Sequence, residues 1–151
     1  MSTLNTSFGP TFRRAMLDDA EAIARLSVQL GYPATTEETA RRLPELMRQT
    51  GHAVYLAEAG GKLIGWVHVF VNYSLVADKP AEVAGLVVDE SHRGLGVGRM
   101  FMELVERWAL EQGCRSVRLR SNVLRSRAHV FYERLGYRVI KSQKAFCKEL
   151  E

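Results

Sequence analysis

The chain has 151 residues, a formal net charge of +4, 46% hydrophobic residues and 25% charged residues. This length suits one soluble domain with a complete core, and the mild positive charge favours anionic ligands without singling out nucleic acid. The two cysteines, Cys114 and Cys147, share no CxxC motif or histidine cluster, which argues against disulfides or a metal site and suits the cytoplasm. No apolar run approaches the roughly 20 residues that span a bilayer, and residues 1–12 lack a signal-peptide pattern.

The first half of the chain predicts a strand, two helical segments and a pair of strands after a polar lead-in. We expect a flexible lead-in at 1–10, a strand at 11–14, helices at 18–31 and 36–50, and strands at 53–59 and 63–73. Asp18 and Glu21 have capping-box character for the first helix, whereas Pro44 should break or kink the second. The Gly60-Gly61 pair suits a tight hairpin, because glycine adopts positive φ without strain.

The second half of the chain alternates strands and helices. We expect a loop at 74–80, a strand at 82–89, a helix at 98–112, a strand at 117–122, a helix at 125–135, and strands at 137–140 and 144–150. The second, third and fourth strands should pair antiparallel. The fourth and fifth strands are joined through a helix and should run parallel. We therefore expect a single α/β domain over residues 11–151.

The glycine-rich turn between the strand at 82–89 and the next helix is the most informative stretch. Gly94, Gly96 and Gly98 occupy alternate positions in it. Such a turn directs several backbone N–H groups at one point, and the positive end of the helix dipole is directed at the same point. Because glycine has no side chain, a bulky anion such as a pyrophosphate can approach the backbone. A glycine-rich loop without a ligand is the alternative.

Two common nucleotide-binding motifs do not match this turn. The Walker motif requires Lys and then Ser or Thr after its last glycine, but Gly98 is followed by Arg99 and Met100. The dinucleotide motif GxGxxG that would begin at Gly94 requires glycine where Arg99 stands. The sequence therefore favours a different phosphate-bearing ligand.

Two blocks of sequence carry a resemblance to a known family. The run Arg93-Gly94-Leu95-Gly96-Val97-Gly98 matches the (Arg/Gln)-x-x-Gly-x-(Gly/Ala) signature of the GCN5-related N-acetyltransferases, the GNAT superfamily. A second run resembles the family block N-x-x-x-x-x-A-x-x-F-Y-x-x-x-G-F/Y at Asn122, Ala128, Phe131, Tyr132, Gly136 and Tyr137. With the preceding strand, the resemblance covers about residues 81–140, and this half is similar to aminoalkylphosphonate and aminoglycoside acetyltransferase-like members.

The resemblance implies a fold, a co-substrate and a set of binding residues. The fold is the GNAT fold, a mixed central sheet of about six or seven strands flanked by about four helices. Acetyl-coenzyme A would bind between the splayed parallel fourth and fifth strands, and no metal is expected. The implied binding residues are Leu86, Val87 and Val88, the loop residues Arg93, Gly94, Leu95, Gly96, Val97, Gly98 and Arg99, and also Asn122, Arg127 and Tyr132. Arg125 and Arg127 could contact the 3′-phosphate of coenzyme A, because a bidentate arginine suits phosphate, and a solvated helix start is the alternative.

The resemblance also implies catalytic roles for two side chains. Tyr132 would protonate the thiolate of coenzyme A as it leaves, although a core aromatic on an amphipathic helix is the alternative. Glu82 would act as the base, through a water molecule, and strand parity places it on the same face as Leu86 and Val88. An exposed carboxylate at the strand end is the alternative for Glu82. The other candidate bases are His68 and Tyr73.

Several functional alternatives remain open from the sequence. A non-catalytic acyl-coenzyme A sensor would bind the coenzyme without turnover, and a protein amine could replace the expected small-molecule amine. A nucleic-acid partner is not expected, because residues 115–127 contain no aromatic residue among their arginines. Side chains that could line the acceptor pocket are Tyr32, Tyr55, Trp66, Asn72 and Tyr73. Dimers are common in the family, so we expect a homodimer.

Overall fold

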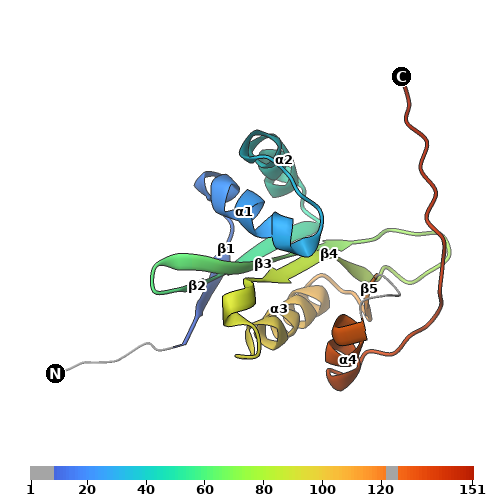
Figure 1. Ribbon diagram of the computed structural model, residues 1–151. Coiled ribbons are helices and arrows are strands. Elements are labelled where there is room, and N and C mark those ends of the chain that lie inside the picture. The colour runs from blue at the N-terminus through green and yellow to red at the C-terminus, as the bar shows by residue number, and fades with distance from the viewer. Residues whose placement is uncertain (1–8, 122–125) are drawn as a thin grey trace. The chain divides into compact units, whose positions relative to one another are not determined.

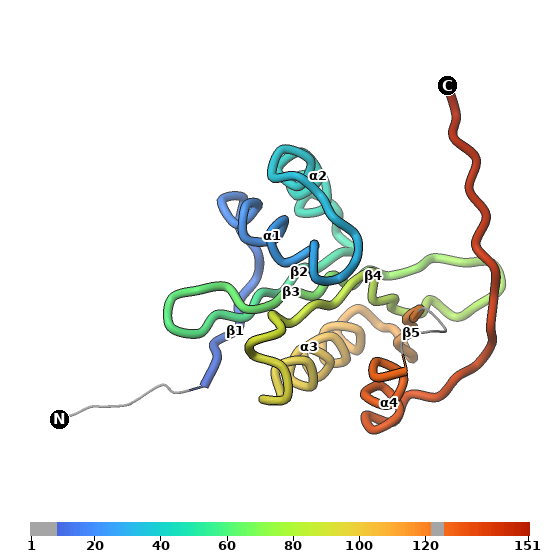
Figure 2. The backbone as a smooth tube through the Cα atoms, viewed as in Figure 1, coloured from blue at the N-terminus to red at the C-terminus, as the bar shows by residue number. Residues whose placement is uncertain are grey.

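The computed structural model describes residues 9–121 and 126–151, and the chain divides into two compact units, residues 1–119 and 120–151. Figures 1 and 2 trace the elements of both units. The first unit contains β1 (Thr11–Arg14), α1 (Ala20–Leu30), α2 (Thr36–Arg48), β2 (His52–Ala59), β3 (Lys62–Val71), β4 (Ala81–Val88), α3 (Val97–Glu111) and β5 (Val117–Leu119). Two short 3-10 helices, η1 (Leu17–Asp19) and η2 (Glu90–His92), complete it. The second unit contains α4 (Ser126–Arg134).

The first unit is built on a five-stranded sheet with the order β1-β2-β3-β4-β5. The strands from β1 to β4 pair antiparallel, whereas β4 and β5 run parallel. Gly60 and Gly61 turn the chain between β2 and β3 with φ angles of 59° and 77°. Helices α1 and α2 cover one face of the sheet and α3 covers the other (Figure 1). The expected α/β class and strand pairings are thereby confirmed.

Buried apolar side chains of α1 and α3 pack against opposite faces of the sheet. Leu26 of α1 is fully buried and belongs to a cluster with Leu56 of β2 and Val87 of β4. On the other face, Phe101 of α3 lies against Gly65, where a Cβ atom would stand 2.9 Å from the ring. Full burial of such a side chain contributes about 1.5–3 kcal/mol, so the apolar stripes of both helices fix them on the sheet.

The first helix begins differently from the expectation. Asp18 is exposed in η1, and α1 begins after Asp19, so the capping box predicted for Asp18 and Glu21 is wrong. The Asp19 carboxylate accepts hydrogen bonds from Arg13 at 2.8 and 2.9 Å and from the Met16 amide at 2.7 Å. This ion pair with β1 holds the chain at Asp19, a contact that the local sequence pattern does not reveal.

The second helix runs without interruption through Pro44, so the predicted break is wrong. It begins with a capping box, in which the Thr35 hydroxyl accepts from the Glu38 amide and the Glu38 carboxylate accepts from the Thr35 amide. Pro44 removes one hydrogen bond to the carbonyl of Ala40. Because Ala40 is exposed, water can satisfy that carbonyl, and the helix continues.

A bulge at Ala84 interrupts the side-chain alternation of β4. The residues on either side of Ala84 face consecutive residues of β3, which leaves Ala84 without a partner on that strand. Glu82, before the bulge, and Leu86, after it, consequently lie on opposite faces of the sheet. The prediction that Glu82 shares a face with Leu86 and Val88 is therefore wrong, because one extra residue shifts the period of two.

The second unit contains α4, and Gly136 ends this helix with a φ angle of 96°. Residues 137–140 and 144–150 have no strand assignment, so the two predicted C-terminal strands are wrong and the described sheet has five strands. A strand requires a neighbouring segment that shares its backbone hydrogen bonds. Here Ile140 and Phe146 are exposed instead of packed over a core.

Candidate functional site

The loop between β4 and α3 holds two glycines in the left-handed region of the backbone. Gly94 has a φ angle of 79°, and Gly96, the N-cap of α3, has a φ angle of 86°. A Cβ atom built on either glycine would meet no heavy atom within 4 Å. The backbone angle, and not crowding inside the chain, therefore requires glycine at these positions. The open space beside them gives a ligand access to the backbone.

The N-terminus of α3 presents backbone N–H groups at the end of this loop. The Met100 amide donates to the Gly96 carbonyl at 3.0 Å. The amides of Val97, Gly98 and Arg99 precede that bond and have no carbonyl acceptor inside the helix. Gly96 has no side chain that could cap them. With the positive end of the helix dipole, these amides form a site for an anion.

The predicted loop residues run from the turn at Arg93–Gly96 into the first turn of α3, and their side chains differ in environment. Val97 is buried beneath the loop, whereas Leu95 is exposed. Arg93 is exposed, and its Nε donates to the Val88 carbonyl at 3.2 Å. Arg99 is exposed and lies 3.5 Å from a carboxylate oxygen of Glu103. The two guanidinium groups add positive charge on either side of the glycines.

Asp89 fixes the beginning of the loop. Its carboxylate accepts hydrogen bonds from Gln29 Nε2 at 2.8 Å and Ser91 Oγ at 2.5 Å, and it lies 3.3 Å from the His92 ring nitrogen. These partners, Gln29 first, hold the pKa of Asp89 well below its usual range. Gln29 also accepts from the Glu90 amide at 2.9 Å. Sequence reasoning missed this anchor, because Gln29 lies on α1, far from the loop in sequence.

Beyond its pairing with β5, the outer edge of β4 pairs with no further strand among the described residues. β5 pairs with β4 only at residues 81–83, whereas β3 pairs with β4 as far as Val88. Within the described residues, the β4 backbone from 85 to 88 therefore has no strand on its β5 side. Among the predicted residues of this segment, Val87 is buried, and Leu86 and Val88 are half-buried. The backbone of these residues can bond a linear ligand along this edge.

Glu82 lies on the sheet face that α1 and α2 cover. Its partner on β3 is Phe70 and its partner on β5 is Arg118. The Glu82 carboxylate is half-buried and accepts a hydrogen bond from Asn72 Nδ2. A carboxylate that is only half-buried keeps contact with water, so its position allows it to receive a proton through a water molecule.

The two other candidate bases differ in environment. His68 lies on the same face as Glu82, and its Nε2 is 2.9 Å from Nδ1 of His52. Burial, with a smaller effect of His52, lowers the pKa of His68 to about 4, and burial also lowers the pKa of His52. Both imidazoles are therefore neutral at pH 7. Tyr73 is 77% exposed after the end of β3.

Three predicted residues belong to the second unit. Tyr132 is half-buried on α4, and its ring centroid lies 4.9 Å from that of Phe131 and 6.0 Å from that of Tyr137. Arg127 is exposed at the start of the same helix. Asn122 lies outside the described residues, as does Arg125. The roles assigned to Tyr132, Arg127 and Asn122 stay predictions.

The side chains suggested for an acceptor pocket divide between the two faces of the sheet. Trp66 and Asn72 lie on the Glu82 face, and Tyr55 lies on the opposite face. The Trp66 indole Nε1 is buried, with no hydrogen-bond partner among the described residues. Tyr32 is 75% exposed in the loop after α1. Trp66 and Asn72 are thus the two that share a surface with the candidate base.

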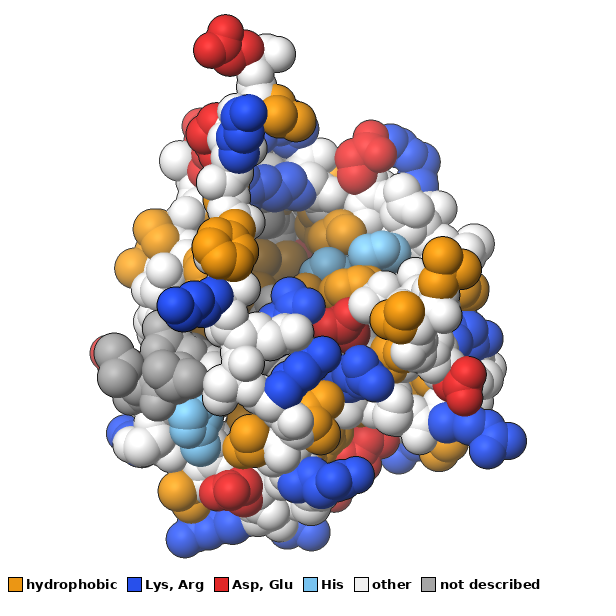
Figure 3. Space-filling view, turned by 90° about the vertical axis from the view of Figure 1, so that its right-hand side faces the viewer, with side chains coloured by type: hydrophobic (Ala, Val, Ile, Leu, Met, Phe, Trp, Pro, Cys, Tyr) orange, Lys and Arg blue, Asp and Glu red, His pale blue; other side chains and the backbone are white. Residues whose placement is uncertain are grey.

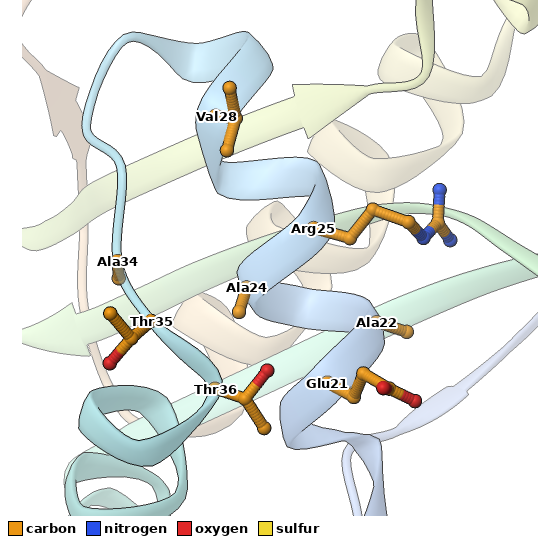
Figure 4. Close-up of a pocket in the computed structure, with 8 residues that line it drawn as sticks. All are labelled: Glu21, Ala22, Ala24, Arg25, Val28, Ala34, Thr35 and Thr36. Atoms are coloured by element: carbon orange, nitrogen blue, oxygen red, sulfur yellow. The ribbon is translucent and has the colours of Figure 1, made fainter.

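A separate cavity lies between α1 and the residues that lead into α2 (Figure 4). It is lined by Glu21, Ala22, Ala24, Arg25, Val28, Ala34, Thr35 and Thr36. Figure 4 shows the Arg25 side chain extending away from Thr35, and this guanidinium donates to the Leu63 carbonyl at 3.1 Å. The lining combines the ionisable side chains of Glu21 and Arg25 with small side chains.

Lys and Arg side chains recur over the face shown in Figure 3, in line with the net charge of +4. No cluster of three or more His, Cys, Asp or Glu side chains suited to a metal ion occurs in the part of the chain that the structure describes. Among residues 9–121 and 126–151, none of the helices has the length and apolar character needed to cross a membrane.

Comparison with known proteins gives a family match. The model of a family described as the acetyltransferase (GNAT) family matches residues 15–137. A Mus musculus protein named "Probable N-acetyltransferase family 8 member 5" is 30% identical over 84 residues, which are 55% of this chain and 37% of that protein. The chain therefore spans little more than a third of the length of this curated relative.

Solved structures share the fold over nearly the whole chain. The aminoglycoside N-acetyltransferase AAC(6')-Iy in complex with CoA gives a TM-score of 0.86 at 19% identity, covering 98% of this chain and 100% of that one. The glucosamine-6-phosphate N-acetyltransferase of Arabidopsis thaliana gives a TM-score of 0.80 at 23% identity, covering 93% and 99%. At these identities the likeness establishes the fold.

Proposed function

We propose an activity for this chain from the premise that it belongs to the acetyltransferase (GNAT) family, as the match over residues 15–137 establishes. The family and enzyme class expected from the two sequence blocks are confirmed by that match. The proposed activity is direct transfer of the acetyl group of acetyl-coenzyme A to a primary amine of a small molecule. The observation that carries it is the open glycine loop at the N-terminus of α3, next to the edge of β4 at residues 85–88 that pairs with no further strand among the described residues.

The loop binds the pyrophosphate of the coenzyme. The amides of Val97, Gly98 and Arg99 donate to phosphate oxygens, because they have no acceptor inside α3. Asp89 and Gln29 hold the beginning of the loop, so these donors need little reorganisation on binding. Backbone groups of residues 86–88 bond the pantetheine arm, and Asn122 and Arg127 contact the rest of the coenzyme.

Two side chains move protons during the transfer. Bound acetyl-coenzyme A supplies the acetyl thioester. Glu82 takes a proton from the acceptor ammonium through a water molecule, and the freed nitrogen lone pair then bonds to the thioester carbonyl carbon. The carbon–sulfur bond breaks, and Tyr132 donates a proton to the departing sulfur. The half-buried carboxylate of Glu82 supports this assignment of the base, and its Asn72 donor fixes the orientation of the carboxylate.

A small-molecule amine is the acceptor that the comparisons support best. One structural neighbour is named as an aminoglycoside N-acetyltransferase, and the other as a glucosamine-6-phosphate N-acetyltransferase. Both matches cover more than nine-tenths of this chain, at 98% and 93%. A sensor without turnover and an acetyltransferase of a protein amine are the outcomes against which this proposal is tested.

We infer a single catalytic domain over residues 11–151 that acts as a homodimer in the cytoplasm. Cys114 and Cys147 are free, which suits a reducing compartment. Phe146 and Leu150 are 91% and 87% exposed, and such apolar side chains favour contact with a second copy. Sedimentation equilibrium tests the dimer, and a monomer at all concentrations contradicts it.

Two variants test the catalytic assignments. Glu82→Gln should lower kcat about a hundredfold and leave acetyl-coenzyme A affinity unchanged, because the amide accepts no proton. Tyr132→Phe should lower kcat in the same way through loss of the acid. Glu111→Gln, a change to an exposed carboxylate on α3, is the control. Turnover by both variants at the wild-type rate across the pH range would remove these residues from the mechanism.

A further inference from the structure

A histidine pair on the Glu82 face has no role in the proton transfers proposed for Glu82 and Tyr132. His52 Nδ1 and His68 Nε2 are 2.9 Å apart, which is a hydrogen-bond distance. The two rings are 5.2 Å apart between centroids, and the His52 ring lies nearly parallel to that of Phe70, at 5.4 Å and 16°. His68 therefore holds the His52 ring from one side while Phe70 supports its face.

The pair and the candidate base belong to one part of the sheet. Phe70 is the register partner of both His52 on β2 and Glu82 on β4, so these three residues form one row across three strands. Register partners project from the same face of an antiparallel sheet. His52 and Glu82 are thus the polar ends of a row with an aromatic residue between them, and Asn72 bonds to the Glu82 end.

The row differs from the neighbouring part of the same face. Under α1, the face carries Leu56 and Val87, which are buried and apolar. In contrast, His52, Phe70 and Glu82 are all half-buried. A half-open surface that combines an aromatic ring with hydrogen-bonding groups suits a small ligand that has both apolar and polar parts.

The charge state of the pair suits an amine ligand. Burial lowers the pKa of both imidazoles, so neither carries a positive charge at pH 7. The pair therefore does not repel an ammonium group that approaches Glu82. One nitrogen of His52, Nδ1, is used in the bond to His68, which leaves Nε2 to bond a ligand. His68 fixes which face of the His52 ring and which nitrogen are presented.

We propose that the acceptor is a hydroxylated amine and that His52 binds it through a hydrogen bond at Nε2. In this arrangement His68 is the residue that positions the His52 ring. This inference rests on the proposed acetyl transfer and specifies its acceptor site. The acceptor amine lies at Glu82, Phe70 contacts its carbon skeleton, and a hydroxyl group reaches His52. The chemistry of the row thus selects a molecule with an amine and a hydroxyl on one skeleton.

Steady-state kinetics with a matched pair of amines tests the inference. Glucosamine has the amine and hydroxyl groups on a ring, whereas cyclohexylamine has the ring and the amine alone. Wild type should acetylate glucosamine with the higher kcat/KM. His52→Phe, which keeps the stacked ring, should raise KM for glucosamine about tenfold, the effect of one lost hydrogen bond, with little change in kcat or in KM for acetyl-coenzyme A. Cyclohexylamine kinetics should not change.

The positioning role of His68 has its own variants. His68→Leu should raise KM for glucosamine several-fold, and His68→Gln should restore it, because the glutamine amide can replace the imidazole Nε2 as a partner for His52. Glu111→Gln changes an exposed carboxylate on α3, and it should leave all constants unchanged. Thermal unfolding of each variant separates a local effect from loss of the fold.

The possible results separate the inference from the proposed function. Unchanged KM for glucosamine in both His52→Phe and His68→Leu would overturn the binding role. Equal effects of these variants on both amines would also overturn it, since such effects indicate packing alone. A wild type that acetylates cyclohexylamine as well as glucosamine overturns the substrate class and leaves acetyl transfer intact. If the wild type releases no coenzyme A thiol with any of the amines tested, the proposed function is overturned, and this inference with it.

Discussion

Gly96→Glu provides a sharp test of the coenzyme loop, and the chain contains a matched control. Gly96 has a φ angle of 86°, and a Cβ atom there would meet no atom within 4 Å. Gly61, in the hairpin between β2 and β3, has a φ angle of 77° and equally open surroundings. Gly61→Glu therefore introduces the same side chain at a similar backbone angle, away from the loop.

The two variants should share a loss of stability and differ in coenzyme binding. A residue with a Cβ atom in the left-handed region costs roughly 1–2 kcal/mol, which lowers Tm by about 2–4 °C per kcal/mol in a chain of this size. At Gly96 the new carboxylate also repels the pyrophosphate. Two unit charges about 4 Å apart interact by about 4 kcal/mol at an effective dielectric constant near 20. If solvent screening halves this energy, Kd for coenzyme A rises about thirtyfold.

Calorimetric titration of coenzyme A into the wild type and both variants measures this difference. Gly61→Glu should bind with the wild-type Kd, whereas Gly96→Glu should bind at least about thirtyfold more weakly. Equal Kd values for all three proteins would refute the placement of the pyrophosphate at this loop. Equal weakening in both variants would show that backbone strain, and not the carboxylate, is responsible.

Three further predictions concern the framework around the site. Gly65→Ala should destabilise the fold by about 1–3 kcal/mol in chemical unfolding, because its Cβ atom would stand 2.8 Å from the Val87 carbonyl oxygen and 2.9 Å from the Phe101 ring. Gly51→Ala should destabilise the fold less, because its Cβ atom would have its nearest neighbour at 3.7 Å. An equal loss of stability in the two variants would argue against this packing. Gln29→Leu should destabilise the fold by about 1–3 kcal/mol and weaken coenzyme binding, because it removes a donor to Asp89 at 2.8 Å. A wild-type free energy of unfolding together with a wild-type Kd for coenzyme A in calorimetry would contradict the anchoring role. The pKa of His68 is about 4 in the folded chain, below the ordinary 6.5, so the unfolded chain binds the proton more readily and stability should fall as the pH drops from about 6.5 to about 4. In urea unfolding, His68→Gln should reduce the slope of the free energy of unfolding against pH. An unchanged slope would contradict the buried neutral state of His68.

The features that the sequence predicted well are those that depend on local chemistry. Gly94 and Gly96 are required by the backbone angles of a single turn, so their pattern identifies the loop without knowledge of the rest of the fold. The Gly60-Gly61 hairpin is predictable for the same reason. The apolar stripe of α3, with Phe101 and Val105 buried, follows from helical periodicity. Family blocks then connected this local pattern to a coenzyme.

The features that the sequence did not predict depend on contacts between distant segments. The bond from Gln29 to Asp89 joins α1 to the end of β4, and neither residue has a local pattern that indicates it. The bulge at Ala84 moved Glu82 to the opposite face from Leu86, and a strict alternation of residues does not indicate where a bulge occurs. Likewise, the bond between His52 and His68 depends on the register of β2 with β3.

The measurement that most directly tests the central claim is thiol release from acetyl-coenzyme A by the wild-type chain with a panel of amines. The panel contains glucosamine, an aminoglycoside, an aminoalkylphosphonate and a lysine peptide, and mass spectrometry identifies the acetylated product. We expect thiol release that depends on a small-molecule amine, with one acetyl group added per thiol released. Tight coenzyme binding without release on any amine would contradict it and favour a sensor, and acetylation of the peptide alone would contradict the small-molecule acceptor.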